Sequence, residues 1–158
     1  MPRVVGRVTY ADVCETPAFV RNNDVKKMPA WFGRGLRYER KVHEKYQDGE
    51  YNYVPNLWFK YTDASRSYKH CSPDALVFDV SAGLVTIVEI KYQHTPRAFW
   101  QLMDLYRPVV TEALSKNWDV ATCEVVKTFV RIPYPCEVQM VGSLNEVQKD
   151  KFNVLIER

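Results

Sequence analysis

Two short apolar runs in the middle of the chain follow the pattern of a β-hairpin. The stretch 74–80 contains Ala75-Leu76-Val77-Phe78, and the stretch 84–92 consists mostly of side chains that favour strands. The polar segment between them ends at Gly83, a residue that suits a tight turn. The sequence therefore predicts two antiparallel strands, 74–80 and 84–92, joined by a turn at Gly83.

The rest of the pattern predicts an alternation of helices and strands. Helical spacing of apolar positions indicates a helix over 33–47, and Thr95-Pro96 has the N-cap and N1 residues that begin a helix over 95–116. Pro108 should kink this second helix because its nitrogen cannot donate a hydrogen bond. Further elements are expected as a short strand within 4–10, a polar loop at 21–28, strands at 51–61 (with Pro55 at an edge or bulge), 119–131, 137–141 and 152–156, and a capped helical turn at 143–146. This order predicts an α/β domain with a mixed sheet flanked by helices.

Two charged residues interrupt the apolar strand 84–92. Glu89 and Lys91 are two positions apart, so they project from the same face of the strand. Antiparallel pairing of the hairpin brings Asp74, at the start of the first strand, opposite this pair. A carboxylate from each strand can share one hard cation such as Mg²⁺, which prefers oxygen ligands. The alternative is a buried Glu–Lys ion pair in an ordinary sheet, which gives Asp74 no role.

The helix over 33–47 carries two glutamates on different faces. Glu39 lies on the apolar stripe with Val42 and Tyr46, whereas Glu44 lies on the charged face. A carboxylate on the inward stripe needs a metal, an arginine or a hydrogen bond, so Glu39 is the candidate ligand. The basic edge of this helix is either a solvated face or a DNA contact, and it comprises Arg34, Arg37, Arg40, Lys41 and Lys45.

Composition fits one compact domain. The chain has 158 residues, of which 46% are hydrophobic and 26% charged. We expect a single domain over 1–158, with a core at about 33–130 and a C-terminal extension at 131–158. The sequence has no apolar run of membrane-spanning length and no secretory signal pattern, so an intracellular location and no membrane partner are expected. The four cysteines form no CxxC pair, which disfavours a zinc ribbon.

Positive charge is concentrated in the first half of the chain. The net charge is +3, but residues 1–70 carry 13 Lys and Arg against 8 Asp and Glu, whereas residues 71–158 carry 9 against 11. A modestly basic half suits a partner that bears phosphate groups.

Three of these segments together resemble the PD-(D/E)XK nuclease superfamily. Gly35–Val42 resembles the first-helix motif of its resolvase branch, and Ser72-Pro73-Asp74 with Glu89-Ile90-Lys91 matches the motif that names it. The match covers roughly residues 33–130. It implies a restriction-endonuclease-like core in αβββαβ order and a metal-dependent deoxyribonuclease, akin to resolvases, RecB-type exonucleases and transposon-end nucleases from phage, mobile elements or DNA repair.

The resemblance also implies residue roles. Asp74 and Glu89 would bind Mg²⁺, for which Mn²⁺ would substitute, with the Ile90 carbonyl as a further ligand and Glu39 acting through water or a second ion. Lys91 would orient or deprotonate the attacking water. DNA is the expected partner. Because the chain has no separate DNA-reading domain, we also expect a homodimer or partner subunits.

Gln101 and His94 are weaker candidates. RecB-type nucleases place a tyrosine four residues after a helical glutamine, whereas here Tyr106 follows Gln101 by five. Gln101 also shares a helix face with Arg97 and Asp104, so a solvated polar stripe is an equal alternative. His94 could contact a phosphate, although a structural or an exposed role is the stronger expectation. The cysteine spacing does not match the iron–sulfur members of the superfamily, so no such cluster is expected.

Two further alternatives stay open. The aromatic residues between Tyr51 and Tyr61 could stack on unpaired bases, although packing in a sheet is favoured. The whole chain could also be a non-catalytic nucleic-acid-binding or assembly module that keeps the fold. The sequence leaves the choice between endonuclease and exonuclease action open.

Overall fold

A six-stranded mixed sheet forms the centre of the molecule. The computed structural model describes residues 3–20, 30–131, 133–134 and 136–158, with side chains of the second range from residue 33, so the polar loop expected at 21–28 lies outside the described residues. The strands are arranged in the order β2-β5-β6-β7-β9-β8. Their bounds are β2 (Asn52–Pro55), β5 (Ala75–Asp79), β6 (Leu84–Gln93), β7 (Asp119–Thr128), β8 (Val138–Val141) and β9 (Phe152–Ile156). The pairs β2–β5 and β5–β6 are antiparallel, whereas β6–β7, β7–β9 and β8–β9 are parallel, which confirms the predicted mixed α/β sheet.

The predicted hairpin is present. β5 and β6 pair antiparallel, and the chain turns through Gly83, whose φ of 63° is a left-handed conformation that favours glycine. The Asp79 side chain accepts hydrogen bonds from the Ser81 hydroxyl and the Ala82 N–H, which holds the other half of the turn.

A second, three-stranded antiparallel sheet is formed by β1 (Tyr10–Cys14), β3 (Trp58–Thr62) and β4 (Tyr68–Cys71), in the order β1-β3-β4. The strand expected over 51–61 is divided between the two sheets as β2 and β3. The division follows Pro55 at Asn56, which has a φ of 58°. The corresponding break between β4 and β5 lies at residues 72–74, and the Asn56 N–H donates to the Asp74 carbonyl at 3.2 Å. Both connections between the two sheets, from β2 to β3 and from β4 to β5, therefore pass beside Asp74.

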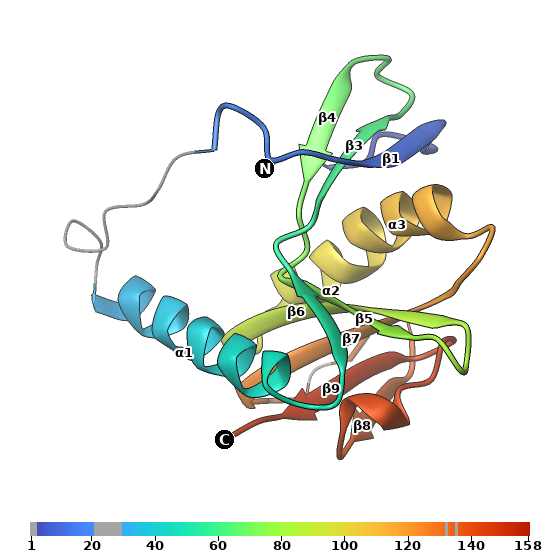
Figure 1. Ribbon diagram of the computed structural model, residues 1–158. Coiled ribbons are helices and arrows are strands. Elements are labelled where there is room, and N and C mark those ends of the chain that lie inside the picture. The colour runs from blue at the N-terminus through green and yellow to red at the C-terminus, as the bar shows by residue number, and fades with distance from the viewer. Residues whose placement is uncertain (1–2, 21–29, 132, 135) are drawn as a thin grey trace.

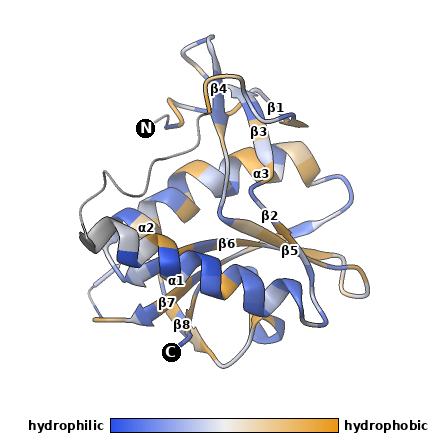
Figure 2. Cartoon of the chain, turned by 60° about the vertical axis from the view of Figure 1, so that its left-hand side comes forward, coloured by the Kyte–Doolittle hydropathy of each residue, from blue (hydrophilic) through white to orange (hydrophobic). Residues whose placement is uncertain are grey.

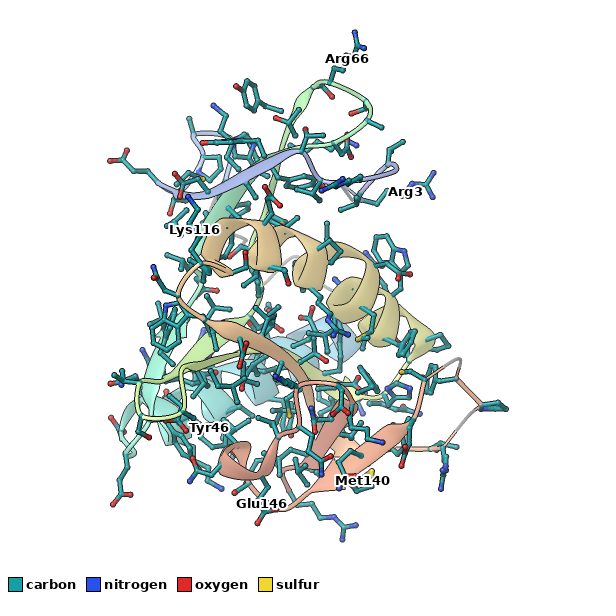
Figure 3. All side chains as sticks on the ribbon, turned by 90° about the vertical axis from the view of Figure 1, so that its right-hand side faces the viewer. Arg3, Tyr46, Arg66, Lys116, Met140 and Glu146 are labelled. Atoms are coloured by element: carbon teal, nitrogen blue, oxygen red, sulfur yellow. The ribbon has the colours of Figure 1, made fainter. Side chains whose placement is uncertain are left out.

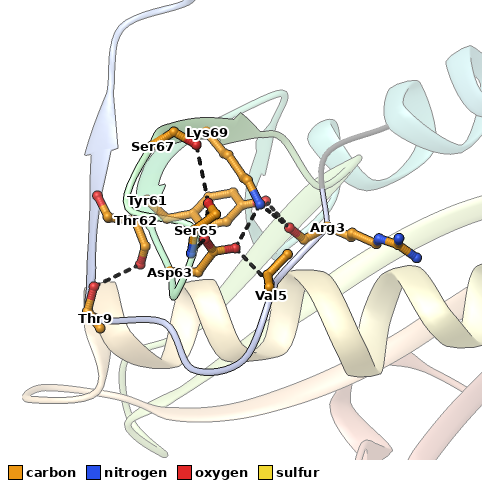
Figure 4. Close-up of polar contacts among 9 residues, drawn as sticks. All are labelled: Arg3, Val5, Thr9, Tyr61, Thr62, Asp63, Ser65, Ser67 and Lys69. Carbon is orange, nitrogen blue, oxygen red and sulfur yellow. Dashed lines mark hydrogen bonds and ion pairs between the residues drawn. The ribbon is translucent and has the colours of Figure 1, made fainter.

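The strand expected within 4–10 is displaced to β1. Gly6 has a φ of 68°, which bends the chain out of an extended path. The segment is instead fixed by Asp63, whose carboxylate accepts from the Val5 N–H, the Ser65 hydroxyl and the Lys69 ammonium (Figure 4). Asp63 is buried, and these donors hold its pKa well below the ordinary range although burial acts in the opposite direction. This network ties the N-terminal segment to the β3–β4 turn.

Helices occupy both faces of the large sheet (Figure 1). One helical rod, which begins at Pro96 as predicted, lies between the two sheets and packs on β1 and β7. It comprises α2 (Pro96–Trp100), the π-helix η2 (Gln101–Tyr106) and α3 (Arg107–Leu114). α1 (Ala30–Gln47) packs on the opposite face against β6, with its hydrophilic side outward (Figure 2). Side chains fill the layers on both sides of the helical rod (Figure 3).

The hydrogen bonding of the second helix changes just before Pro108, the residue at which a kink is expected. The six residues that directly precede α3 are π-helical, and the Arg107 N–H donates to the Leu102 carbonyl, five residues back. A π-helix holds one extra residue in a turn and adjusts the hydrogen bonding locally. Thr95 precedes this helix, but its side chain makes no capping hydrogen bond.

The C-terminal extension belongs to the central sheet. β9 inserts between β7 and β8, so residues 138–156 supply two of the six strands. The expected capped turn is the 3₁₀ helix η3 (Leu144–Glu146), but its cap differs from the prediction. Ser143 makes no side-chain cap, and the Glu146 carboxylate instead accepts from the Gly142 N–H at 2.7 Å.

Candidate functional site

Asp74 and Glu89 face each other at the end of the β5–β6 hairpin. Ala75 pairs with Val88, and extending this register by one residue sets Asp74 opposite Glu89. The Ile90 N–H donates to Oδ2 of Asp74 at 2.7 Å. Glu89 is only 3% exposed, and its Oε2 atom has no hydrogen-bond partner among the described residues. A buried carboxylate oxygen without a donor is costly unless a ligand satisfies it.

The two carboxyl groups perturb each other. Burial, and then the adjacent Glu89, raise the pKa of Asp74 well above its ordinary range. Burial also raises the pKa of Glu89, against the opposing effects of a hydrogen bond with Asp74 and the positive charge of Lys91. Glu39 adds negative charge near both groups. A concentration of negative charge in a low-dielectric site suits a divalent cation.

One pocket of about 460 Å³ collects the candidate residues from four different elements. α1 supplies Glu39, the connection that leads into β5 supplies Asp74, β6 supplies Glu89 and Lys91, and the π-helix supplies Gln101. We call this space the carboxylate pocket. Its complete lining is Gly35, Leu36, Glu39, Asp74, Glu89, Ile90, Lys91, Tyr92, Gln93, Thr95, Gln101 and Tyr106.

Glu39 reaches this pocket from the other face of the sheet and is held there by a hydrogen-bonded chain. Its Oε1 atom lies 3.3 Å from Nε2 of His43, and Nδ1 of His43 lies 2.7 Å from the Tyr53 hydroxyl. The sequence reasoning missed His43 and Tyr53 in this role. The signal in the sequence was the i,i+4 spacing of Glu39 and His43, which places both on one side of a helix. Glu44 is exposed, as expected for a solvated residue.

Gln101 is not part of a solvated stripe. It is 3% exposed, and its Oε1 atom has no hydrogen-bond partner among the described residues. Tyr106, five residues later, lines the same pocket. Five residues correspond to the i→i+5 repeat of the π-helix. The π-helix therefore accommodates the extra residue between Gln101 and Tyr106, and both of these side chains line the pocket.

His94 lies away from the carboxylate pocket, which corrects its assignment as a phosphate contact. It is buried, with Nδ1 at 2.5 Å from Oε1 of Glu124 and Nε2 against the Tyr134 hydroxyl. Both ring nitrogens are therefore engaged within the protein. Burial lowers the pKa of His94.

Glu124 is a second residue that the sequence reasoning missed. It lies on β7 beside Glu89 in the parallel register and is completely buried, and its Oε2 has no hydrogen-bond partner within the described part of the chain. Burial raises its pKa to about 8, although the charge of Lys91 acts in the opposite direction. A glutamate in the run Thr122-Cys123-Glu124-Val125-Val126 was a signal of the same kind as Glu89, namely a charge within an apolar strand.

A smaller basic pocket of about 220 Å³ adjoins the carboxylate pocket through Tyr92, which lines both. We call it the basic pocket. It includes Arg34, Arg37 and Lys41, as the basic edge of the first helix suggested, and adds Lys127 and Arg158, which sequence spacing could not associate with them. Arg34 and Lys127 both lie over the Tyr92 ring, at 5.4 and 5.3 Å from its centroid. Arg40 and Lys45 do not line it, and Lys45 pairs with Glu157.

The protein supplies part of the ligand set that a magnesium-type ion needs. Among the described residues, no three His, Cys, Asp or Glu side chains are gathered closely enough to form a ready metal centre. Asp74 and Glu89 supply a carboxylate pair with an unsatisfied oxygen, and Ile90 lies next to them in the pocket. Mg²⁺ is usually held by one or two carboxylates, with water and phosphate as the other ligands. This pair therefore meets that requirement.

Comparison with known proteins gave no match to a protein-family model, a curated protein or a solved structure. Within the part of the chain that the structure describes, no helix is both long and apolar enough to cross a membrane.

Proposed function

We propose that this chain is a Mg²⁺-dependent deoxyribonuclease with the restriction-endonuclease-like fold of the PD-(D/E)XK superfamily. The observation that supports it most strongly is the carboxylate pocket, into which four separate elements bring Glu39, Asp74, Glu89, Lys91 and Gln101. An ordinary buried Glu–Lys pair would not need Asp74, whose proximity to Glu89 is electrostatically unfavourable without a cation. The arrangement has the character of a binding site for positive charge.

Asp74 and Glu89 would hold the ion, with the Ile90 carbonyl as a further ligand. When bound, Mg²⁺ supplies neutralisation of the charge that develops on the phosphate. Glu39 is fixed by His43 at the pocket edge, where it can accept a hydrogen bond from a water molecule. This arrangement agrees with a role through water better than with direct ligation.

Lys91 and Gln101 would act on the nucleophile and the phosphate. Lys91 projects from the same face of β6 as Glu89, so its ammonium group and the carboxylate face the same space. It would orient the attacking water and stabilise negative charge on the phosphate oxygens. The buried amide of Gln101 has an unsatisfied oxygen that can accept a hydrogen bond from the same water.

The basic pocket would bind the nucleic-acid backbone next to the scissile phosphate. Five cationic side chains line it, and none of its described lining residues is a carboxylate, so it favours an anion. Tyr92 follows Lys91 directly and separates the two pockets. A backbone that enters the basic pocket is therefore directed towards the carboxylates.

Calorimetric titration with Mn²⁺ tests the ion site without relying on cleavage. The wild-type chain should bind Mn²⁺, and Asp74→Asn should lose that binding while keeping the acceptor for the Ile90 N–H. Glu44→Gln is the matched control, because it removes one exposed carboxylate from α1 outside the pocket. A wild-type chain that binds DNA but no Mn²⁺ would favour the non-catalytic module instead.

A further inference from the structure

A third pocket, larger and more aromatic, adjoins the carboxylate pocket through Tyr106, whereas the basic pocket adjoins it through Tyr92. It has a volume of about 700 Å³, within the range of small-molecule sites. We call it the aromatic pocket. It is lined by Thr16, Phe19, Val20, Asn56, Trp58, Tyr68, Lys69, His70, Cys71, Ser72, Leu105 and Tyr106.

The aromatic and carboxylate pockets are directly connected. Tyr106 lines both. Ser72 lines the aromatic pocket two residues before Asp74, and its hydroxyl is fixed by donation to the Leu57 carbonyl at 2.9 Å. The same connection between β4 and β5 therefore supplies a wall of one pocket and a carboxylate of the other. A ligand in the aromatic pocket would lie beside a group at the carboxylates.

The aromatic rings of this pocket are available to a ligand. Phe19 is 65% exposed, and its ring meets Trp58 at 6.1 Å and His70 at 5.6 Å between centroids, both in edge-type geometry. Tyr68 is also exposed. Exposed large aromatic side chains that gather around a cavity indicate an interaction site.

Polar groups between the aromatic rings limit the kinds of ligand that the pocket can bind. Asn56, Lys69 and His70 add hydrogen-bonding groups to the aromatic walls. Lys60 lies outside the lining, with its ammonium 4.1 Å from the centre of the Tyr68 ring, and contributes positive charge. A flat ring system with polar edges and an attached anion matches this combination. A nucleobase on a phosphodiester chain has those properties.

We propose that the aromatic pocket receives an unpaired nucleobase from the same strand whose phosphate lies at the carboxylate pocket. This inference rests on the proposed nuclease function and specifies its substrate. Three adjoining pockets, joined through Tyr106 and Tyr92, would follow one strand from base to scissile phosphate to backbone. A base inside a continuous duplex is stacked and paired, so it cannot enter without being extruded. The substrate class is therefore nucleic acid with an unpaired nucleotide beside the cleavage position.

Fluorescence of a base analogue tests this inference separately from cleavage. The full chain is titrated, in EDTA, into a short single-stranded DNA containing one 2-aminopurine, and into the same strand annealed to its complement. Stacking on an aromatic side chain should quench the single-stranded probe. Phe19→Ser should weaken binding by roughly 5- to 150-fold, as expected for the loss of base–aromatic stacking. Phe19→Tyr should keep most of the affinity.

Val80→Ser is the control, because it removes an exposed apolar side chain at the far turn of the β5–β6 hairpin. The high exposure of Phe19 means that its replacement should leave the thermal midpoint unchanged, which is checked in parallel. Equal quenching by wild type and Phe19→Ser, or equal affinity for the single strand and the duplex, would overturn the inference. Quenching without any Mg²⁺-dependent cleavage would leave base binding intact and reject the nuclease function. Cleavage without quenching would support the nuclease function and reject base binding in the aromatic pocket.

Discussion

The main-chain N–H of Ile90 donates a 2.7 Å hydrogen bond to Oδ2 of Asp74. This bond fixes the position of the first carboxylate against the strand that carries the second. It also explains how two mutually repelling groups are kept together, because the Asp74 side chain is anchored to the sheet backbone. Asparagine can accept the same hydrogen bond through its carbonyl oxygen, so the Asp74→Asn variant isolates the effect of charge.

Asp74→Asn should increase the stability of the metal-free protein. Removing one of two interacting carboxylates relieves their unfavourable proximity, so we expect a gain in unfolding free energy of about 1–2 kcal/mol. Urea unfolding in EDTA at neutral pH measures it, with Glu44→Gln expected to change stability by less than about 0.5 kcal/mol. A loss of stability in Asp74→Asn would show that the carboxylate is a structural group and not a strained functional one.

The pH dependence of stability should report on Glu124. Its pKa is about 8 in the folded chain against an ordinary value of 4.5, so between these values the folded state binds more protons than the unfolded state. The free energy of unfolding should therefore fall as pH rises through this window. Asp74 and Glu89 act in the same direction, whereas the lowered pKa of His94 acts in the opposite direction.

Glu124→Gln isolates this contribution. It imitates the protonated carboxyl group and should make the pH dependence shallower, with its advantage over wild type growing from pH 5 to pH 8, as the folded-state pKa requires. Chemical unfolding over a pH series in EDTA gives the two slopes. Parallel slopes for wild type and Glu124→Gln would contradict a raised pKa at this residue.

The π-helix should tolerate the loss of one residue where an α-helix does not. Deleting the exposed Asp104 from η2 should convert that turn to α-helix and leave the positions of Gln101 and α3 largely unchanged. Deleting the exposed Glu112 from α3 is the matched control, since it shifts Ala113 and Leu114 out of their packing against the core. Circular dichroism and thermal midpoints should show a smaller loss for the Asp104 deletion, and equal losses would count against this explanation of η2.

The Asp63 network should be a main support of the N-terminal segment. Asp63→Ala leaves the Val5 N–H and the Lys69 ammonium without their buried acceptor, for an expected loss of about 2–3 kcal/mol. Because the pKa of Asp63 is lowered, its contribution is present above the ordinary aspartate value and is lost as pH falls below it. Acid titration should therefore reduce the difference between wild type and Asp63→Ala. A difference that stayed constant to low pH would exclude this role.

Local patterns were sufficient for much of the fold. The turn at Gly83 and the apolar runs beside it determined the hairpin, and the face of the strand correctly paired Glu89 with Lys91. The positions of Asn56 and residues 72–74 as crossing points between two sheets were not predicted. A strand that passes from one sheet to another keeps its alternating pattern, so the sequence shows only a turn residue after Pro55.

Contacts between segments far apart in the sequence could not be predicted from the pattern of residues. Lys127 and Arg158 join the first helix only through the order of β6, β7 and β9. The burial of Gln101 depends on the π-helix. In the sequence, its extra residue was visible only as a Gln101–Tyr106 spacing of five instead of the four found in RecB-type nucleases. The network of Glu124, His94 and Tyr134 requires three segments that share no local motif.

Cleavage of labelled DNA tests the central claim most directly. Wild-type protein is incubated with Mg²⁺ or Mn²⁺ and a panel of linear, circular, single-stranded and branched DNA, beside Asp74→Asn, Lys91→Ala and the Glu44→Gln control. We predict metal-dependent cleavage by wild type and Glu44→Gln, a rate lower by about 10³-fold or more in Asp74→Asn and Lys91→Ala, and faster cleavage beside unpaired nucleotides. Cleavage at the wild-type rate by either pocket variant, or none by wild type with either metal on any DNA in the panel, would contradict the assignment.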